Sequence, residues 1–288
     1  MQFCLSAVNV IAHKQNSYDY RLDSLFSGLF INPNQANSSD TMAQASSQQG
    51  KASASSYHII ITGASRGIGK ALAEVLAAES GDIILHLVAR SPLSELMEEI
   101  SKRGRQVFSY GFDLSRTDGI EVLTEELFSN VKDTSASVAL VNNAGMLAPM
   151  GPIGKHETET YRKNLEVNFV APVLLCQEFI KRTAGFSGHR QILNVSSGAA
   201  LNPYYGWSHY CSTKAGLDML TKCVALEHGK ALSVHGFNPG RTDTQMQNEM
   251  REQSPENFEH VRNFVEAYET GALNAPEAVA TMMGQVLT

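Results

Sequence analysis

A glycine-rich segment follows a short apolar run and leads into a helical pattern. It reads Thr62-Gly-Ala-Ser-Arg-Gly-Ile-Gly69. Glycines at such a turn let the backbone approach a phosphate, and the next helix offers unpaired N–H groups with a partial positive charge. The spacing G-x-x-x-G-x-G meets the general dinucleotide fingerprint G-x-G-x-x-G only in part. We therefore expect a dinucleotide site formed by Gly63, Ser65, Arg66, Gly67, Ile68 and Gly69.

The charge at the end of the next apolar run indicates which dinucleotide binds. About 20 residues beyond the last glycine, an NAD site places Asp or Glu for the ribose 2′-hydroxyl. This sequence has Arg90 at that point. Arg66 and Arg90 could converge on a 2′-phosphate through charge-assisted hydrogen bonds, each worth roughly 1.5–3 kcal/mol. This favours NADP(H) as the cofactor; the alternative is that both arginines are solvated surface residues.

The elements that position this turn form an alternating pattern from Tyr57 onward. Near-continuous apolar runs separated by amphipathic stretches are typical of a parallel sheet covered on both faces. The pattern predicts a single α/β domain with a doubly wound, Rossmann-type sheet in three layers, and ligands at the carboxyl ends of the strands. The expected strands are 58–62, 83–88, 106–110, 138–141, 191–195 and 233–237, and the expected helices are 68–80, 93–103, 119–131, 157–183, 210–228 and 276–285.

Further motifs stand at the ends of the later strands. They are Asn142-Asn-Ala-Gly145, Ser197, Tyr210-x-x-x-Lys214 and Pro239-Gly240. Each is weak alone, since Tyr and Lys at i,i+4 are a common solvated pair on a helix. In this order, and with Ser thirteen residues before Tyr, they resemble the short-chain dehydrogenase/reductase superfamily. The resemblance extends from about Tyr57 to the C-terminus.

The resemblance implies a catalytic set of Asn168, Ser197, Tyr210 and Lys214. Reduction of a ketone needs a hydride at carbon and a proton at the incipient alkoxide. Tyr210 would supply the proton, and Ser197 would hold the carbonyl oxygen. A free tyrosine titrates near pH 10, so we expect the positive charge of Lys214, one helical turn away, to lower the pKa of Tyr210 toward neutral pH. Asn168 would anchor a water that leads protons to the lysine.

The resemblance also implies further cofactor contacts along the strand ends. Asp113 would bind the adenine, Asn142 and Ala144 would line the adenosine ribose, and Lys214 would bind the nicotinamide ribose. Thr242 and Thr244 would bind the carboxamide. The full set beyond the glycine turn and Arg90 is Asp113, Leu114, Asn142, Ala144, Gly145, Tyr210, Lys214, Pro239, Gly240, Thr242 and Thr244.

The segment before Tyr210 indicates the substrate. Pro203-Tyr-Tyr-Gly-Trp207 ahead of Tyr210-Cys-x-x-Lys-Ala resembles the sepiapterin reductase branch and the related benzil reductases. We expect an NADPH-dependent carbonyl reductase acting on a small 1,2-dicarbonyl substrate. Leu147, Tyr204, Trp207 and Met246 would wall an apolar pocket for it. The alternative for Trp207 is structural packing over the start of a helix.

Two other functions stay open. One is a general 3-oxoacyl or sugar ketoreductase of the same superfamily. The other is a non-catalytic protein that senses NADP, against which the complete catalytic set argues.

Composition excludes other classes of protein. The 288 residues carry a formal net charge of -6, which makes nucleic acid or an anionic membrane an unfavourable partner. No apolar run approaches the ~20 residues of a membrane helix. Four cysteines without a C-x-x-C pair predict neither disulfides nor a metal site. We expect a soluble, cytoplasmic protein, and the apolar face of 169–180 predicts a homodimer.

The two ends of the chain depart from this pattern. The segment 33–56 is rich in Ser, Ala, Gln and Asn, so residues 1–56 are predicted to be a disordered extension and residues 57–288 the folded domain. Alternatives for the extension are a mitochondrial presequence, which its few arginines support weakly, and translation from Met42. At the other end we expect the sheet to lack its last strand.

Overall fold

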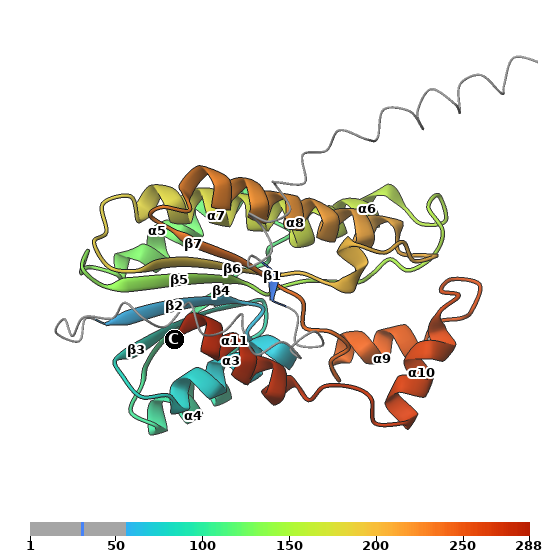
Figure 1. Cartoon of the computed structure of the whole chain (residues 1–288), viewed down its shortest axis with the longest axis horizontal. Helices are drawn as coiled ribbons and strands as arrows, with labels where there is room; N and C mark the ends of the chain where they lie inside the picture. The colour runs from blue at the N-terminus through green and yellow to red at the C-terminus, as the bar shows by residue number, and fades with distance from the viewer. Residues whose placement is uncertain (1–29, 32–55) are drawn as a thin grey trace, which may run out of the picture.

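The computed structural model describes residues 30–31 and 56–288, which form a three-layer α/β domain (Figure 1). All strand pairs are parallel, and the order across the sheet is β1-β7-β6-β5-β2-β3-β4. The doubly wound fold is confirmed, and each of the six expected strands lies within one residue of its prediction. The strands are β1 (Phe30–Ile31), β2 (Tyr57–Thr62), β3 (Ile83–Ala89), β4 (Gln106–Gly111), β5 (Ser137–Asn142), β6 (Arg190–Val195) and β7 (Ser233–Phe237).

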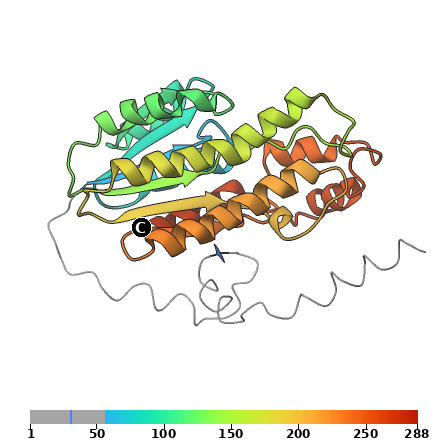
Figure 2. The ribbon, with the colours of Figure 1, turned by 90° about the horizontal axis from the view of Figure 1, so that it is seen from above.

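Helices cover both faces of the sheet (Figures 1 and 2). On one face, α3 (Gly67–Ala78), α4 (Ser94–Lys102) and α11 (Pro276–Leu287) bury their apolar sides. On the other face lie α5 (Ile120–Ser129), α7 (Ala171–Arg182) and α8 (Ser208–His228). Because both faces are buried, the central strands are apolar on both sides.

The expected helix 157–183 is interrupted. It consists of α6 (Thr158–Leu165), a π-helical turn η3 (Glu166–Val170) and α7. Such single π turns often lie at functional sites. The apolar face predicted for 169–180 packs within the domain, because Leu175, Cys176 and Phe179 of α7 are buried in the core on this side of the sheet. This apolar face therefore gives no separate argument for a dimer.

Strand β1 lies at the edge of the sheet next to β7. Phe30 pairs with Gly236 and Ile31 with Phe237, and the Asn238 N–H donates to the Ile31 carbonyl at 2.9 Å. The edge beyond β7, where the sequence led us to expect no strand, is thus paired by a short segment from the N-terminal extension. The rest of that extension, residues 1–29 and 32–55, lies outside the described residues.

Two helices beyond the expected set project at one end of the domain (Figure 1). They are α9 (Gln245–Arg251) and α10 (Val261–Glu269), inserted between β7 and α11. Within residues 30–31 and 56–288, no helix is long and apolar enough to cross a membrane.

Candidate active site

The glycine turn between β2 and α3 is held in one shape by the end of β5. Backbone N–H groups of Asn143 and Ala144 donate to the Thr62 hydroxyl at 3.0 and 3.1 Å, and the Asn143 amide donates to the Thr62 carbonyl at 2.9 Å. A Cβ on Gly69 would lie 2.4 Å from the Gly63 carbonyl oxygen and 2.5 Å from the Asn143 amide nitrogen. A larger residue at Gly69 would therefore displace the turn.

The start of α3 fits a bound pyrophosphate. Gly63 and Gly67 have φ angles of 70° and 54°, which favour glycine. Arg66 at the N-cap makes no side-chain capping hydrogen bond, so that side chain leaves the first-turn N–H groups available. Anions bind such helix starts through these groups and the helix dipole. The residues present fit a dinucleotide.

The loop after β7 closes over the same turn. A Cβ on Gly67 would lie 3.3 Å from the Thr244 methyl carbon, so these two segments are in close approach. Thr242 is buried and its hydroxyl donates to the Pro239 carbonyl at 3.2 Å. Gly240 has a φ of 67°, and its N–H donates to the Asn238 side chain at 3.1 Å. The expected contacts from this loop thus lie beside the glycine turn.

The expected phosphate-binding arginines are both exposed. The Arg66 guanidinium donates to Gln245 on α9 at 2.6 Å, which ties the glycine turn to α9. Arg90 lies near Asp113: burial opposes ionisation of that carboxyl, but two hydrogen bonds from Ser115 and the charges of Lys163 and Arg90 lower its pKa. Arg90 and Asp113 therefore lie at the same end of the sheet, where an adenosine would lie.

The two neighbouring asparagines after β5 have different tasks. Asn142 is buried, and its amide donates to Asn194 at 2.8 Å and to the Cys176 sulfur at 3.4 Å. The amide nitrogen of Asn142 thus points into the interior, and a contact to the cofactor would come from its backbone. Asn143, which the sequence did not single out, holds the glycine turn instead. The repeated Asn-Asn was the available signal for it.

Tyr210 and Ser197 meet at the carboxyl end of β6. Tyr210 lies in the first turn of α8 and is 6% exposed. Burial raises its pKa to about 12, and a hydrogen bond with Ser197 opposes the rise. The expected lowering of the Tyr210 pKa toward neutral pH is not found, because burial disfavours the charged phenolate. Tyr210 is therefore protonated at neutral pH, the form that can donate a proton.

Lys214 lies one turn further along α8. It is 4% exposed, its ammonium lies 5.8 Å from the centre of the Tyr210 ring, and it donates to the Val195 carbonyl at 2.8 Å. Burial lowers the pKa of Lys214 to about 8, and the Asp218 carboxylate opposes that shift. Lys214 is thus the first lysine or arginine that follows Tyr210 along α8.

Asn168 lies in the π turn η3 and is fully buried. Its side-chain oxygen accepts the Met146 N–H at 2.8 Å, and its amide donates to the Met146 carbonyl at 2.7 Å and to Asn164 at 3.0 Å. Asn164 in turn donates to the Ala148 carbonyl at 2.8 Å. The two asparagines hold the loop after Gly145 against α6 and η3.

The four expected substrate residues share one apolar cluster with Tyr210. Leu147 and Trp207 are buried, and Tyr204 and Met246 are partly buried. The Trp207 ring stacks on Phe258 at 4.5 Å and meets Tyr210 edge-on at 5.6 Å. Phe258 and Phe264, which the sequence analysis missed, complete the cluster from the α9–α10 region. The spacing of Val261, Phe264 and Ala267 along one helical face was the signal for α10.

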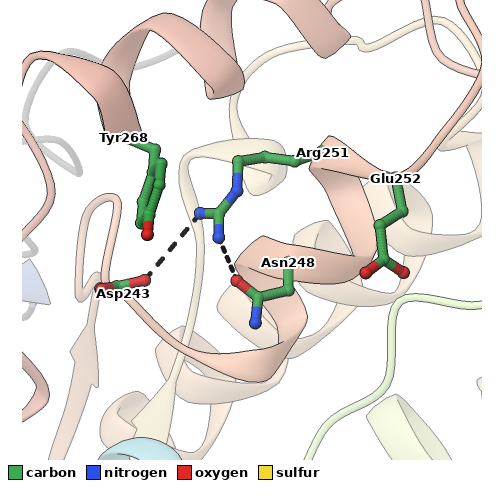
Figure 3. Close-up of a pocket in the computed structure, with 5 residues that line it drawn as sticks. All are labelled: Asp243, Asn248, Arg251, Glu252 and Tyr268. Atoms are coloured by element: carbon green, nitrogen blue, oxygen red, sulfur yellow. Dashed lines mark hydrogen bonds and ion pairs between the residues drawn. The ribbon is translucent and has the colours of Figure 1, made fainter.

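A separate polar cavity of about 420 Å³ lies between α9 and α10 (Figure 3). Arg251 lies in it over the Tyr268 ring at 3.8 Å, 3.9 Å from an Asp243 oxygen, and donates to Asn248. These contacts occupy much of its guanidinium. The contacts of Arg251 connect α9 with Tyr268 of α10. Ser197, Tyr210 and Lys214 are not among the residues that line this cavity.

Comparisons with known proteins agree with this geometry. The family model for short chain dehydrogenases matches residues 57–255. The chain is 37% identical to a benzil reductase ((S)-benzoin forming) of Bacillus cereus, over 80% of this chain and 93% of the relative. It is 32% identical to the sepiapterin reductase of Rattus norvegicus, over 68% of this chain and 78% of the relative.

A solved structure shares the fold. A short chain dehydrogenase/reductase from Saccharomyces cerevisiae superposes with a TM-score of 0.72 at 27% identity, over 80% of this chain and 90% of that chain.

Proposed function

The chain belongs to the short-chain dehydrogenase/reductase family, and we propose that, among these NAD(P)-dependent oxidoreductases, it uses NADPH to reduce a 1,2-diketone to a hydroxyketone. The observation that carries the proposal is the meeting of Tyr210, Ser197 and Lys214 at the end of β6, beside an aromatic cluster. Benzil, the diketone named for the Bacillus cereus relative, is the first substrate to test.

The residues divide the work of carbonyl reduction between them. Ser197 would donate a hydrogen bond to the substrate oxygen, and the protonated Tyr210 would give that oxygen its proton. The ammonium of Lys214 would stabilise the phenolate left on Tyr210, since opposite charges attract strongly in a buried site. The nicotinamide, when bound, supplies the hydride to the carbonyl carbon. Asn168 holds the loop that follows Gly145 in register with this pair.

The aromatic cluster supports a flat, conjugated substrate. Trp207 lies next to Tyr210 and Tyr204 lies next to Trp207, and aromatic rings bind planar groups by offset or edge-on packing. A 3-oxoacyl thioester or a sugar offers no flat conjugated ring for these side chains. This difference favours the dicarbonyl reductase over the general ketoreductase, and the complete set of Ser197, Tyr210 and Lys214 favours an enzyme over a protein that only senses NADP.

One assay separates these alternatives. NADPH oxidation is measured with benzil, sepiapterin and an acetoacetyl thioester side by side. We expect turnover of benzil to be fastest. Fast turnover of the thioester alone would replace the proposal by a general ketoreductase, and cofactor binding without any turnover would favour the sensor.

The cofactor preference depends on Arg90. In Arg90→Ala we expect the KM for NADPH to rise about 10- to 100-fold, the value of one charge-assisted phosphate contact, with little change for NADH. Arg103→Ala, which removes an exposed charge after the last turn of α4, is the matched control. An equal loss for both cofactors in Arg90→Ala would refute a 2′-phosphate contact. The homodimer and the cytoplasmic location stay predictions.

A further inference from the structure

Three consecutive residues at the end of β6 engage α8 at three successive turns. Ser197 bonds Tyr210, the Val195 carbonyl accepts from Lys214 at 2.8 Å, and the Ser196 hydroxyl donates to Asp218. Residues 210, 214 and 218 are four apart, so they lie along one side of the helix. The first two contacts belong to the site already described. The third contact fixes a carboxylate one helical turn beyond the lysine on the same side of α8.

The Asp218 carboxylate is fixed in place by a hydrogen bond from Ser196. It is half-buried, and burial raises the pKa of its carboxyl above the ordinary value, while the Ser196 hydrogen bond and the charges of Lys214 and Lys222 oppose that rise. Ser196 is itself buried, and its N–H donates to the Phe237 carbonyl of β7 at 2.7 Å. The serine is thus fixed by the sheet and fixes the carboxylate in turn.

Lys214 needs such a partner. Only 4% of Lys214 is exposed, and burial favours the neutral amine. A backbone carbonyl offers only a partial charge, and Tyr210 is neutral while it carries its proton. Asp218 is the carboxylate that opposes the effect of burial on this lysine.

We propose that Asp218 is a positioning residue, tied to the sheet by Ser196, that keeps Lys214 in its ammonium form beside Tyr210. The proposal rests on the proposed function, because only a charged Lys214 stabilises the phenolate of Tyr210. An uncharged side chain at position 218 would leave Lys214 to lose its proton at a lower pH. Since the ammonium is the active form, activity falls as pH rises through the pKa of Lys214.

The test compares Asp218→Asn with the wild type in pH profiles of NADPH-dependent benzil reduction. We expect the alkaline fall of kcat/KM to begin about one pH unit lower in Asp218→Asn, the lower end of the shift caused by one nearby opposite charge. Ser196→Ala should move it in the same direction by less. Glu227→Gln, which removes an exposed charge near the far end of α8, should leave it unchanged.

A second readout does not depend on activity. The ¹³Cε signals of labelled lysines report each pKa, and Lys214→Arg identifies the signal of Lys214. We expect that signal to titrate about one pH unit lower in Asp218→Asn and in its normal place in Glu227→Gln. An unchanged titration would overturn the proposal even if the enzyme reduces no diketone, and a shifted titration with an unmoved alkaline limb would overturn the link to catalysis. If Asp218→Asn does not fold, an unshifted Lys214 signal in Ser196→Ala overturns it.

Discussion

The sheet carries two buried networks of titratable groups, and they differ in charge. Along α8, Tyr210, Lys214 and Asp218 lie one turn apart at the carboxyl end of β6. Across β2, β3 and β4 runs a chain of neutral groups: His58 bonds His86 at 2.9 Å, and His86 bonds the Tyr110 hydroxyl at 3.0 Å. The network along α8 contains charged groups, Lys214 and Asp218, each of which has a hydrogen-bond partner. The chain of His58, His86 and Tyr110 contains no charged group.

The pKa values show why burial alone does not identify a site. Burial lowers the pKa of His86 to about 3, with His58 adding to the effect, a larger change than burial causes in Lys214. His86 is nevertheless fully buried in the middle of β3, away from the strand ends. A shifted pKa indicates function when the group also lies at the strand ends, where ligands bind. We therefore propose that the α8 network serves chemistry, and we expect the histidine chain to serve stability.

The largest expected effect is on the catalytic network. Tyr210→Phe removes the proton donor and keeps the ring that packs against Trp207, so we expect kcat for benzil to fall by about 10²–10⁴-fold with NADPH affinity kept. Steady-state kinetics and cofactor titration measure the two quantities. Tyr205→Phe is the matched control, because Tyr205 is 48% exposed and lies on the adjacent loop. Full activity in Tyr210→Phe would remove the tyrosine from the mechanism.

The sequence revealed most of the fold because its strands are coded locally. The runs from His58 and from Ile83 are β-branched and apolar, and the turn after each carries the motif residues. The π turn at 166–170 was not foreseen; it coincides with the tertiary contact of Asn168 with Met146, which the local sequence does not reveal. The pairing of Phe30 and Ile31 with β7 was missed for a similar reason: two residues are too few to show a period.

The site was foreseen in its residue types more than in its wiring. The resemblance to the superfamily pointed to Ser197, Tyr210 and Lys214, whose types suit the chemistry of carbonyl reduction, and the structure brings them together. Their partners depend on side-chain direction, which spacing does not determine. Asn143 rather than the Asn142 side chain holds the glycine turn, and Asp218 lies beyond the motif that drew attention to Lys214.

The next effect concerns the histidine chain and stability. His86 stays neutral when folded, but free histidine titrates near 6.5, so only the unfolded chain takes up its proton as pH falls below 6.5. Stability should therefore decrease toward acid pH, by up to about 1.4 kcal/mol per pH unit for this group. Urea unfolding between pH 7.5 and 4.5 measures it. His86→Gln should flatten the slope, and parallel curves for the two proteins would contradict the neutral-chain assignment.

The smallest effect separates the two networks. Tyr110→Phe removes the hydroxyl that bonds His86 and accepts the Asn130 amide at 3.2 Å. We expect the free energy of unfolding to drop by about 1–2 kcal/mol, with kcat/KM for benzil unchanged. Urea unfolding and initial rates at pH 7.5 provide both numbers. A large loss of activity at unchanged stability would mean that the histidine chain contributes to catalysis.

The central claim is that this chain delivers a hydride and a proton to one carbonyl of a 1,2-diketone. NADPH deuterated at the transferred position of C4 is mixed with benzil, and the product is analysed by mass spectrometry for the wild type and Tyr210→Phe. We predict benzoin carrying one deuterium on its carbinol carbon, formed rapidly by the wild type and at least about 100-fold more slowly by the variant. Benzoin without deuterium, no benzoin at all, or equal rates for the two proteins would contradict it.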